Sequence, residues 1–281
     1  MSPEVEILQF FARFIETELG IVYAEHNYFQ LQNRLEDIAR LMGVANLQLL
    51  HEQAKKGIVG HFRQLLLDVA TNNETSFFRD ANVFKAIEST LIPDVVAKAG
   101  TNKIRIWSAA ASTGQEALSV AMLLEEWALK NFKTVQYHIT GTDISERALT
   151  RAKSSNYSQL EVQRGLPAPL MIKYFTKDDQ DRWTATEKLT KNILFKSQNL
   201  KEPYPFTEKF DVVLCRNVLI YQSVEGKKAI LERITQTLRP DGYLIMGSGE
   251  SLMGLSDDYD KVAVDGAVIY RKKSATKSLA A

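Results

Sequence analysis

The first hundred residues show a helical spacing of hydrophobic side chains. Apolar residues recur at steps of three and four positions, and the first two runs stop at Gly20 and Gly43. This period places the apolar side chains on one face of a helix, and glycine commonly follows a helix end. Shorter stretches at 47–56 and 62–71 continue the pattern. We therefore expect a small all-helical bundle whose phenylalanines form its core.

After Gly100 the pattern changes to alternating strands and helices. The expected strands are short apolar runs at 104–107, 137–142, 209–215 and 243–246, with a final pair at 261–264 and 267–271. Helical stretches at 118–129, 146–153 and 224–238 separate them, and a turn is expected at 239–242. Such alternation predicts a mostly parallel, Rossmann-like α/β sheet, and the final pair predicts a hairpin.

Residues 165–198 interrupt this rhythm. Two short stretches there, 183–186 and 193–196, could be strands of a small antiparallel β insertion. The predicted organisation is a helical N-terminal domain with a linker over 1–95 and an α/β domain over 96–273 that includes the insertion. A disordered tail is expected over 274–281.

One segment joins a strand to a helix through a tight turn of small residues. The strand at 104–107 runs into Ser108-Ala109-Ala110-Ala111-Ser112-Thr113-Gly114-Gln115-Glu116, and the next strand ends at Asp143. A strand, turn and helix of this kind typically hold a nucleotide-type ligand over the carboxyl ends of the strands. An acid after the second strand is placed to accept hydrogen bonds from ribose hydroxyls.

The turn differs from phosphate-binding loops. It has a single glycine, Gly114, where the dinucleotide fingerprint has three, and no Gly-Lys-Ser/Thr follows. Glu116 stands in the first helical turn, where it would repel a polyphosphate and favour a cationic ligand. S-adenosylmethionine fits, since it has a ribose diol, a sulfonium and no phosphate. Alternatively, Glu116 only complements the helix dipole and Asp143 caps the helix that starts near Ser145.

Two further polar segments adjoin the expected sheet. Residues 71–80 are polar, then doubly aromatic, then charged, and Arg79 could bind a carboxylate through two parallel hydrogen bonds. Alternatively, this is a capping loop in which Arg79 pairs with Asp80 or a neighbouring acid. The second segment, 215–221, follows a strand at the same edge as Asp143, so the topology gathers three separate segments around one crevice.

Composition narrows the possible partners. The chain has 35 Lys plus Arg and 34 Asp plus Glu, so no global field favours nucleic acid or an anionic membrane. The one cysteine, Cys215, is expected in the core, and the four histidines lack ligand spacing, so we predict no metal. Neither a signal peptide nor a long apolar run is evident. We expect a cytoplasmic monomer without membrane insertion.

Five motifs in order resemble the chemotaxis receptor methyltransferases, the CheR family. They are Asn73-Glu74-Thr75-Ser76-Phe77-Phe78-Arg79-Asp80, Ala110-Ala111-Ser112-Thr113-Gly114-Gln115-Glu116, Gly141-Thr142-Asp143-Ile144-Ser145, Cys215-Arg216-Asn217-Val218-Leu219-Ile220-Tyr221 and Gly247-Ser248-Gly249-Glu250-Ser251-Leu252. The similarity extends from about Thr71 to Leu252, with the helical domain in its expected place.

The resemblance implies an S-adenosylmethionine-dependent O-methyltransferase fold and activity. It implies that the enzyme esterifies glutamates on cytoplasmic helices of chemoreceptors, releases S-adenosylhomocysteine, and can hold a receptor C-terminal peptide at the β insertion. Mapped by motif, the residues implied at the cofactor are Asn73, Thr75, Arg79, Glu116, Asp143, Asn199, Leu200, Arg216 and Asn217. Arg79 and Tyr221 are implied at the reacting centre.

The chain departs from the family pattern at two motifs. It has Ala117-Leu118 where the family commonly has Pro-Tyr, and Ser248 where histidine is common. Two rival functions stay open at this point. One is a non-catalytic receptor-binding module on a methyltransferase fold, and the other is a methyltransferase for a small molecule or nucleic acid.

Overall fold

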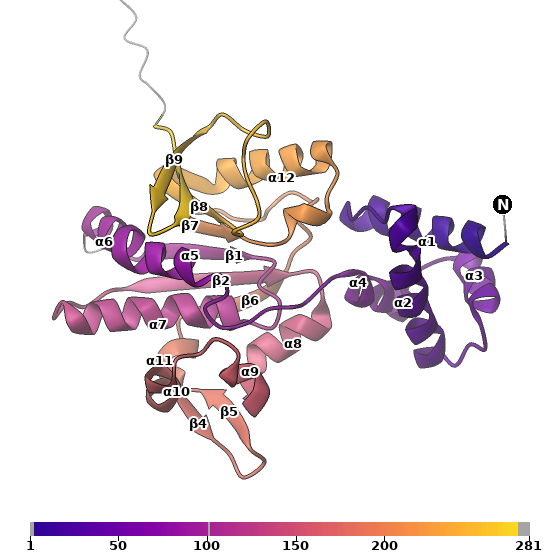
Figure 1. Cartoon of the computed structure of the whole chain (residues 1–281), viewed down its shortest axis with the longest axis horizontal. Helices are drawn as coiled ribbons and strands as arrows, with labels where there is room; N and C mark the ends of the chain where they lie inside the picture. Colours follow the sequence, from indigo (N-terminus) through magenta and orange to yellow (C-terminus); the bar gives the residue numbers. More distant parts are fainter. Residues whose placement is uncertain (1–2, 101, 275–281) are drawn as a thin grey trace, which may run out of the picture.

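The amino-terminal part of the chain forms a helical bundle with its own core. The computed structural model describes residues 3–100 and 102–274. The bundle consists of α1 (Pro3–Leu19), η1 (Glu25–Asn27), α2 (Tyr28–Leu41), α3 (Leu47–Lys56) and α4 (Gly60–Ala70) (Figure 1). Buried apolar residues of α1 to α4 pack against one another, Phe11 and Phe62 among them. The helices predicted from the periodicity are therefore confirmed.

A seven-stranded sheet forms the second part. Its strands are β1 (Ile104–Ala109), β2 (Tyr137–Asp143), β6 (Ile193–Ser197), β7 (Phe210–Cys215), β8 (Leu238–Met246), β9 (Tyr259–Val264) and β10 (Ala267–Lys272). Their order is β6-β2-β1-β7-β8-β10-β9; the first five are mutually parallel, and β10 is antiparallel to both its neighbours. The predicted Rossmann-like sheet and closing hairpin are confirmed. The chain order reverses beside β1, which is where such sheets bind ligands.

Helices cover both faces of this sheet. One face carries α5 (Ala81–Ala86), a π-helical turn η2 (Ile87–Leu91), α6 (Ile92–Ala99), α7 (Gln115–Lys130) and α8 (Glu146–Ser154). The other face carries α12 (Val224–Thr237), which packs with Trp107 and Phe210 in a separate cluster. A short helix, η3 (Leu219–Tyr221), follows β7. The alternating side chains of the strands thus supply two cores, one on each face.

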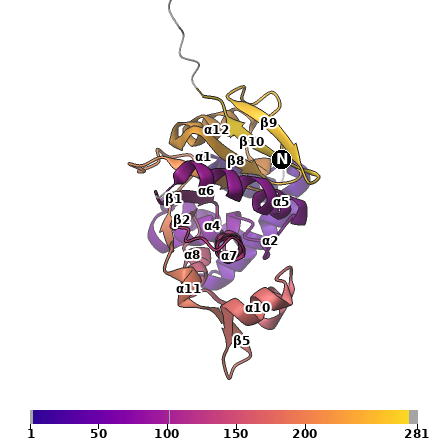
Figure 2. The same cartoon turned by 90° about the vertical axis from the view of Figure 1, so that its left-hand side faces the viewer.

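The predicted insertion is present, but its strands differ from those expected. A three-stranded antiparallel sheet of order β3-β5-β4 projects from the domain, as Figure 2 shows. The insertion as a whole consists of β3 (Asn156–Ser158), α9 (Gln159–Gln163), α10 (Ala168–Tyr174), β4 (Phe175–Lys177), β5 (Arg182–Ala185) and α11 (Glu187–Thr190). The stretch expected at 193–196 is instead β6, a parallel edge strand paired with β2, so its assignment to the insertion was wrong.

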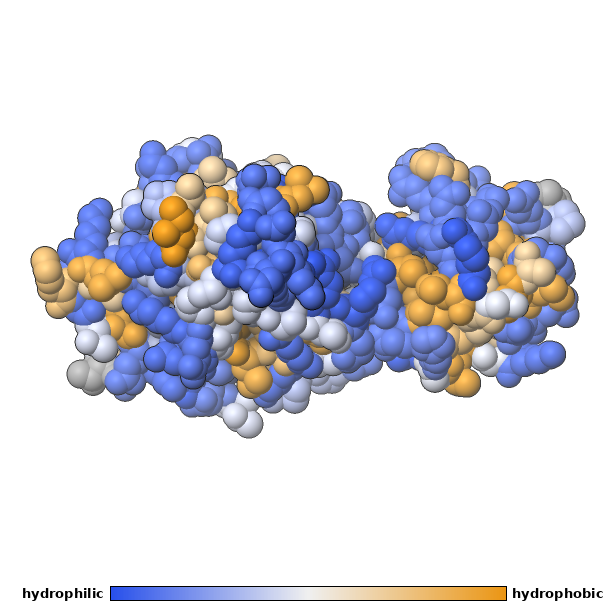
Figure 3. All heavy atoms as spheres, turned by 90° about the horizontal axis from the view of Figure 1, so that it is seen from below, coloured by the Kyte–Doolittle hydropathy of each residue, from blue (hydrophilic) through white to orange (hydrophobic). Residues whose placement is uncertain are grey.

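The bundle core and the core under α5 to α8 meet at the linker, residues 71–80, and not at residue 95. The bundle core ends with Ala70, whereas Phe77 and the apolar residues of α5 and α6 belong to the core under the sheet. The predicted boundary at 95 is therefore displaced, because helical periodicity does not reveal which core a helix covers. Figure 3 shows the bundle and the sheet domain as two lobes joined at a narrow waist.

One local feature of the sheet bears on the pocket described below. Gly141 in β2 lies against the ring of Phe195, and a Cβ atom at position 141 would stand 2.5 Å from that ring. Away from the pocket, the turn predicted at 239–242 is instead the irregular start of the interior strand β8, with a register shift opposite 210–212. The predicted tail over 274–281 lies outside the described residues except for Ser274.

Candidate functional site

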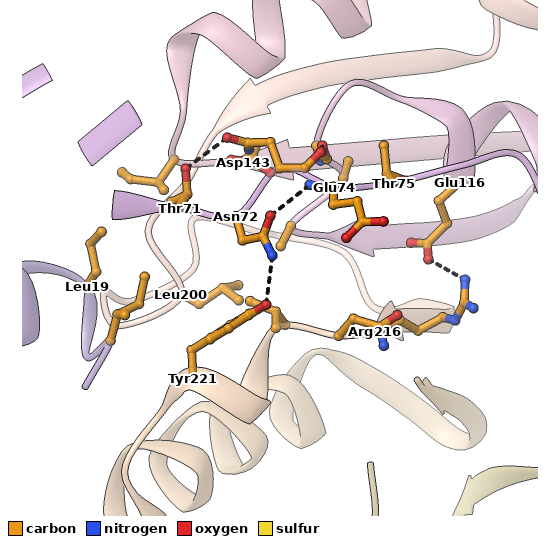
Figure 4. A pocket seen from close by; sticks show the side chains of 18 of the residues that line it. Leu19, Thr71, Asn72, Glu74, Thr75, Glu116, Asp143, Leu200, Arg216 and Tyr221 are labelled. Carbon is orange, nitrogen blue, oxygen red and sulfur yellow. Dashed lines mark hydrogen bonds and ion pairs between the residues drawn. The ribbon is translucent and has the colours of Figure 1, made fainter. Parts of the chain in front are cut away.

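All ten residues singled out by the sequence line one pocket. It lies at the carboxyl ends of β1, β2 and β7, beside the linker between the lobes, and has an empty volume of about 960 Å³ including its mouth. The ten are Asn73, Thr75, Arg79, Glu116, Asp143, Asn199, Leu200, Arg216, Asn217 and Tyr221. Figure 4 shows Leu19 and Leu200 toward one end of this pocket and Glu116 with Arg216 at the other.

Asp143, at the end of β2, is a buried carboxylate held by backbone amides. Its side chain accepts hydrogen bonds from the N–H groups of Ser112 (2.8 Å) and Ser145 (2.9 Å), and the residue is 5 % exposed. Burial raises the pKa of Asp143 despite these bonds. The cap of α8 is Ser145, whose hydroxyl accepts from the N–H of Ala148. The alternative in which Asp143 caps this helix is thus not what the structure shows.

The turn after β1 positions this contact. Ala110 and Ser112 both have positive φ (61° and 51°), so the chain folds tightly and directs the Ser112 N–H toward Asp143. The Ser112 hydroxyl donates to the carbonyl of Asn73 (2.7 Å), which ties the linker to the turn. Small side chains at this turn therefore leave the strand ends open to a ligand.

Arg216, just after β7, is the buried centre of an ionic cluster. Its side chain is 2 % exposed and pairs with Glu116 (2.9 Å) and Asp80 (3.0 Å). It also lies over the ring of Phe84, 5.2 Å from the ring centroid. Ser108 donates a further hydrogen bond to Glu116 (2.6 Å). Two carboxylates on one guanidinium leave a net negative charge beside the pocket, which suits a cationic ligand.

The pKa of Asp80 in this cluster is shifted in the opposite direction from that of Asp143. Burial acts to raise the pKa of Asp80, but the backbone N–H of Ser248 and the Arg216 guanidinium outweigh burial and lower it. The backbone N–H of Ser248 donates to Asp80 (3.2 Å), and the Ser248 side chain also contributes to lowering the pKa of Asp80. Asp80 is therefore ionised and structural.

Arg79 lies at the end of the linker, and Tyr221 lies in η3; both line the pocket. Arg79 donates to the carbonyl of Glu74 (2.9 Å) and, within residues 3–100 and 102–274, no carboxylate lies within 4.0 Å of its guanidinium. The alternative in which Arg79 pairs with Asp80 is wrong, because Asp80 pairs with Arg216. Tyr221 accepts a hydrogen bond from the side chain of Asn72 (3.0 Å) across the pocket (Figure 4).

The loop after β6 supplies the remaining predicted residues. Asn199 is 8 % exposed, and its amide nitrogen donates to the carbonyl of Glu18 in α1 (2.8 Å). Leu200 and Ile144 add apolar surface to the same end of the pocket. An apolar surface there, next to the Asp143 carboxylate, fits an adenine ring attached to a ribose.

Sequence reasoning missed contributors of two kinds. Leu19 and Ile21 of the helical lobe line the pocket, although their apolar side chains carry no chemical signature. Glu250 accepts hydrogen bonds from the backbone N–H groups of Asn217 (2.6 Å), Leu219 (3.1 Å) and Gly247 (2.9 Å). The motif at 247–252 did indicate Glu250, but gave no role; the structure shows that it braces the chain after β7.

The part of the chain that the structure describes contains neither a metal-type cluster nor a membrane-spanning helix. In the ranges 3–100 and 102–274, no group of three or more His, Cys, Asp and Glu side chains is placed to hold a metal ion. No helix in that part of the chain is both long and apolar enough to cross a membrane.

The parallel sheet and its pocket define the class of the protein. Rossmann-like domains with an acid after the second strand and no phosphate-binding glycines are typical of S-adenosylmethionine-dependent methyltransferases. The residues present fit that cofactor, because Asp143 can accept from ribose hydroxyls and the cluster around Arg216 favours positive charge.

Comparison with known proteins gives the family. Residues 73–268 match the family described as CheR methyltransferase, SAM binding domain. The chain is 35 % identical over 265 residues to chemotaxis protein methyltransferase Cher2 of Pseudomonas putida, covering 94 % of this chain and 96 % of that protein. It is 37 % identical over 265 residues to a chemotaxis protein methyltransferase of Vibrio anguillarum, covering 94 % and 95 %. The chain therefore belongs to the CheR methyltransferase family, and the resemblance drawn from its motifs is confirmed.

Proposed function

We propose that this protein transfers a methyl group from S-adenosylmethionine to glutamate side chains on the cytoplasmic helices of chemoreceptors. The observation that carries the proposal is Arg79, which lines the cofactor pocket with no carboxylate of the described chain within 4.0 Å. Its remaining N–H groups can therefore bind an incoming carboxylate. The names of the relatives, chemotaxis protein methyltransferases, support the choice of receptor.

A glutamate acceptor suits a pocket without a general base. A glutamate side chain has a pKa of about 4.3, so at neutral pH it is already the nucleophilic carboxylate. The protein's contribution is then placement, which can lower a barrier by roughly 7–11 kcal/mol when the reacting atoms are aligned. When bound, S-adenosylmethionine supplies a methyl group on a positively charged sulfur, and S-adenosylhomocysteine is left.

The pocket residues divide this work. Asp143 would accept hydrogen bonds from the ribose hydroxyls, and Leu200 would pack against the adenine. Glu116, whose oxygens already accept from Ser108 and Arg216, contributes negative charge toward the cationic end. Arg79 orients one oxygen of the acceptor, and Tyr221, fixed by Asn72, lies beside it. No metal is required by this chemistry, and a monomer suffices.

The insertion gives a second place for the receptor. Its sheet has exposed edge strands, β3 and β4, on which an extended receptor C-terminal peptide could add as a further strand. This element would tether the enzyme near its acceptor glutamates without contributing to the chemistry.

Transfer of labelled methyl groups tests the proposal. The protein is incubated with labelled S-adenosylmethionine and a receptor cytoplasmic fragment, and the product is treated with mild base. We expect label on the receptor that is released as methanol, since esters hydrolyse under these conditions. Base-stable label would indicate an N-methyl or ether product and would contradict the proposal that glutamate is the methyl acceptor. Binding of the receptor without any transfer would indicate a non-catalytic module.

A further inference from the structure

Helix α1 ends at the pocket with no basic residue of its own to balance it. Its last turn contains Glu16 and Glu18, and no Lys or Arg. The last four carbonyls of a helix lack partners within the helix, and its carboxyl end carries partial negative charge. The carbonyl of Glu16 accepts from the N–H of Gly20 (2.8 Å), and the carbonyls of Thr17, Glu18 and Leu19 need donors from elsewhere.

Three side chains of the sheet domain supply these donors. The ammonium group of Lys201 donates to the carbonyls of Glu16 (3.1 Å) and Thr17 (2.5 Å). Asn199 donates to the carbonyl of Glu18 (2.8 Å), and Gln222 to that of Leu19 (3.0 Å). All four terminal carbonyls of α1 are thus bound by the opposite lobe. We call Lys201, Asn199 and Gln222 the latch.

The chain leaving α1 is fitted closely to the latch. Gly20 has a φ of 73°, and a Cβ atom there would lie 2.1 Å from the Gln222 side-chain oxygen. The N–H of Val22 then donates to the carbonyl of Tyr221 (2.9 Å), and Ile21 forms a bridge with Gln222. This arrangement places Leu19 and Ile21 on the pocket wall beside Tyr221.

We propose that the latch closes the cofactor pocket by holding the helical lobe against the sheet domain, with Lys201 as its main positioning residue. Lys201 itself does not line the pocket, so it acts through α1. If only the closed form presents Leu19 and Ile21, the apparent affinity for the cofactor falls in proportion to the closed fraction. The inference rests on the cofactor part of the proposed function and is independent of the methyl acceptor.

Calorimetric titration with S-adenosylhomocysteine tests the latch on the full-length chain. We expect Lys201→Met to raise the dissociation constant about tenfold, because it removes two charge-assisted hydrogen bonds. Lys201→Arg, which keeps the charge and can reach both carbonyls, should restore binding to within about threefold of the unaltered protein. Steady-state kinetics should show the effect in KM for S-adenosylmethionine and little change in kcat.

Lys209→Met is the matched control. Lys209 also donates to a carbonyl near a helix end, that of Gln236 in α12, but both groups lie within the sheet domain away from the pocket. The affinity of the Lys209→Met variant for S-adenosylhomocysteine should equal that of the unaltered protein. Should Lys201→Met not fold, Gln222→Met removes the donor to Leu19. Because Gln222 also lines the pocket, exchange of the Val22 amide, and not affinity alone, is then the readout for the latch.

Amide hydrogen exchange gives a readout of closure itself. In Lys201→Met the Val22 amide should exchange faster than in the unaltered protein and in Lys209→Met. Equal affinities for Lys201→Met and the unaltered protein overturn the latch while leaving the proposed function intact. Failure of the unaltered protein to bind S-adenosylhomocysteine at all overturns the cofactor assignment and the latch with it.

Discussion

The two ends of the pocket hold their carboxylates differently. At the end of β2, Asp143 is held by backbone N–H groups alone, and burial raises its pKa. At the end of β7, Arg216 pairs directly with Glu116 and Asp80. Among the described residues no cation pairs with Asp143, whereas Glu116 and Asp80 share the Arg216 guanidinium. The difference indicates that the β2 end is built for a ligand's hydroxyl groups, whereas the β7 end fixes the chain and leaves an excess of negative charge beside the pocket.

Removing the guanidinium should break this contrast with the largest effect. Arg216→Met leaves Glu116 and Asp80 without their cation, and breaking a buried ion pair costs about 3–5 kcal/mol. We expect a loss of that size in the free energy of unfolding, measured with urea.

Arg151→Met is the control for that prediction, because its pair with Glu161 has both side chains partly in water (44 % and 27 % exposed). It should cost about 0–1 kcal/mol. Equal losses for the two variants would show that the Arg216 cluster is no more than a surface ion pair.

Removing the acid at the β2 end should act on the ligand. Asp143→Ala eliminates the acceptor for ribose hydroxyls, and hydrogen bonds to a charged group are worth about 1.5–3 kcal/mol. We expect the dissociation constant of S-adenosylhomocysteine to rise roughly tenfold to a hundredfold in calorimetry. Tyr221→Phe should lower turnover yet leave this constant within about twofold. Unchanged affinity in Asp143→Ala would contradict the assignment.

The smallest expected effect is a pair of opposite pH dependences. The pKa of Asp143 is raised on folding, so its contribution to stability is present below its unfolded pKa and is lost as pH rises through the folded pKa. The pKa of Asp80 is lowered, so its contribution is present above the unfolded pKa and is lost as pH falls through the folded pKa.

Melting temperatures measured as a function of pH test these two opposite dependences. From about pH 4 upward, Asp143→Asn should gain in melting temperature relative to the unaltered protein, and Asp80→Asn should lose. The same trend in both variants would remove the contrast between the two ends.

Much of the fold and the motif-bearing part of the pocket could be predicted from the sequence. Helical periodicity located α1 to α4, and residues with distinctive chemistry, such as Asp143 and Arg79, do line one pocket. Their individual roles stay predictions. Pairing could not be predicted: the stretch at 193–197 has the alternation of any short strand, and only tertiary packing places it beside β2.

The apolar and indirect contributors were hidden for the same reason. Leu19 and Ile21 look like ordinary core residues, and their place at the pocket depends on how two lobes meet. Lys201 reads as a surface lysine until the carbonyls of α1 are seen next to it. Local sequence cannot reveal contacts between residues that lie 184 and 185 positions apart.

The close approach of Gly141 to Phe195 has a consequence for which mutations this enzyme can accept. A methyl group at position 141 would push the aromatic ring outward, and with it the edge strand β6 and the loop after it that contains Leu200. Fewer amino-acid substitutions should therefore be tolerated at Gly141, which contacts no ligand, than at several residues that line the pocket. In a mutational survey, damage to cofactor recognition should appear there with no binding group altered.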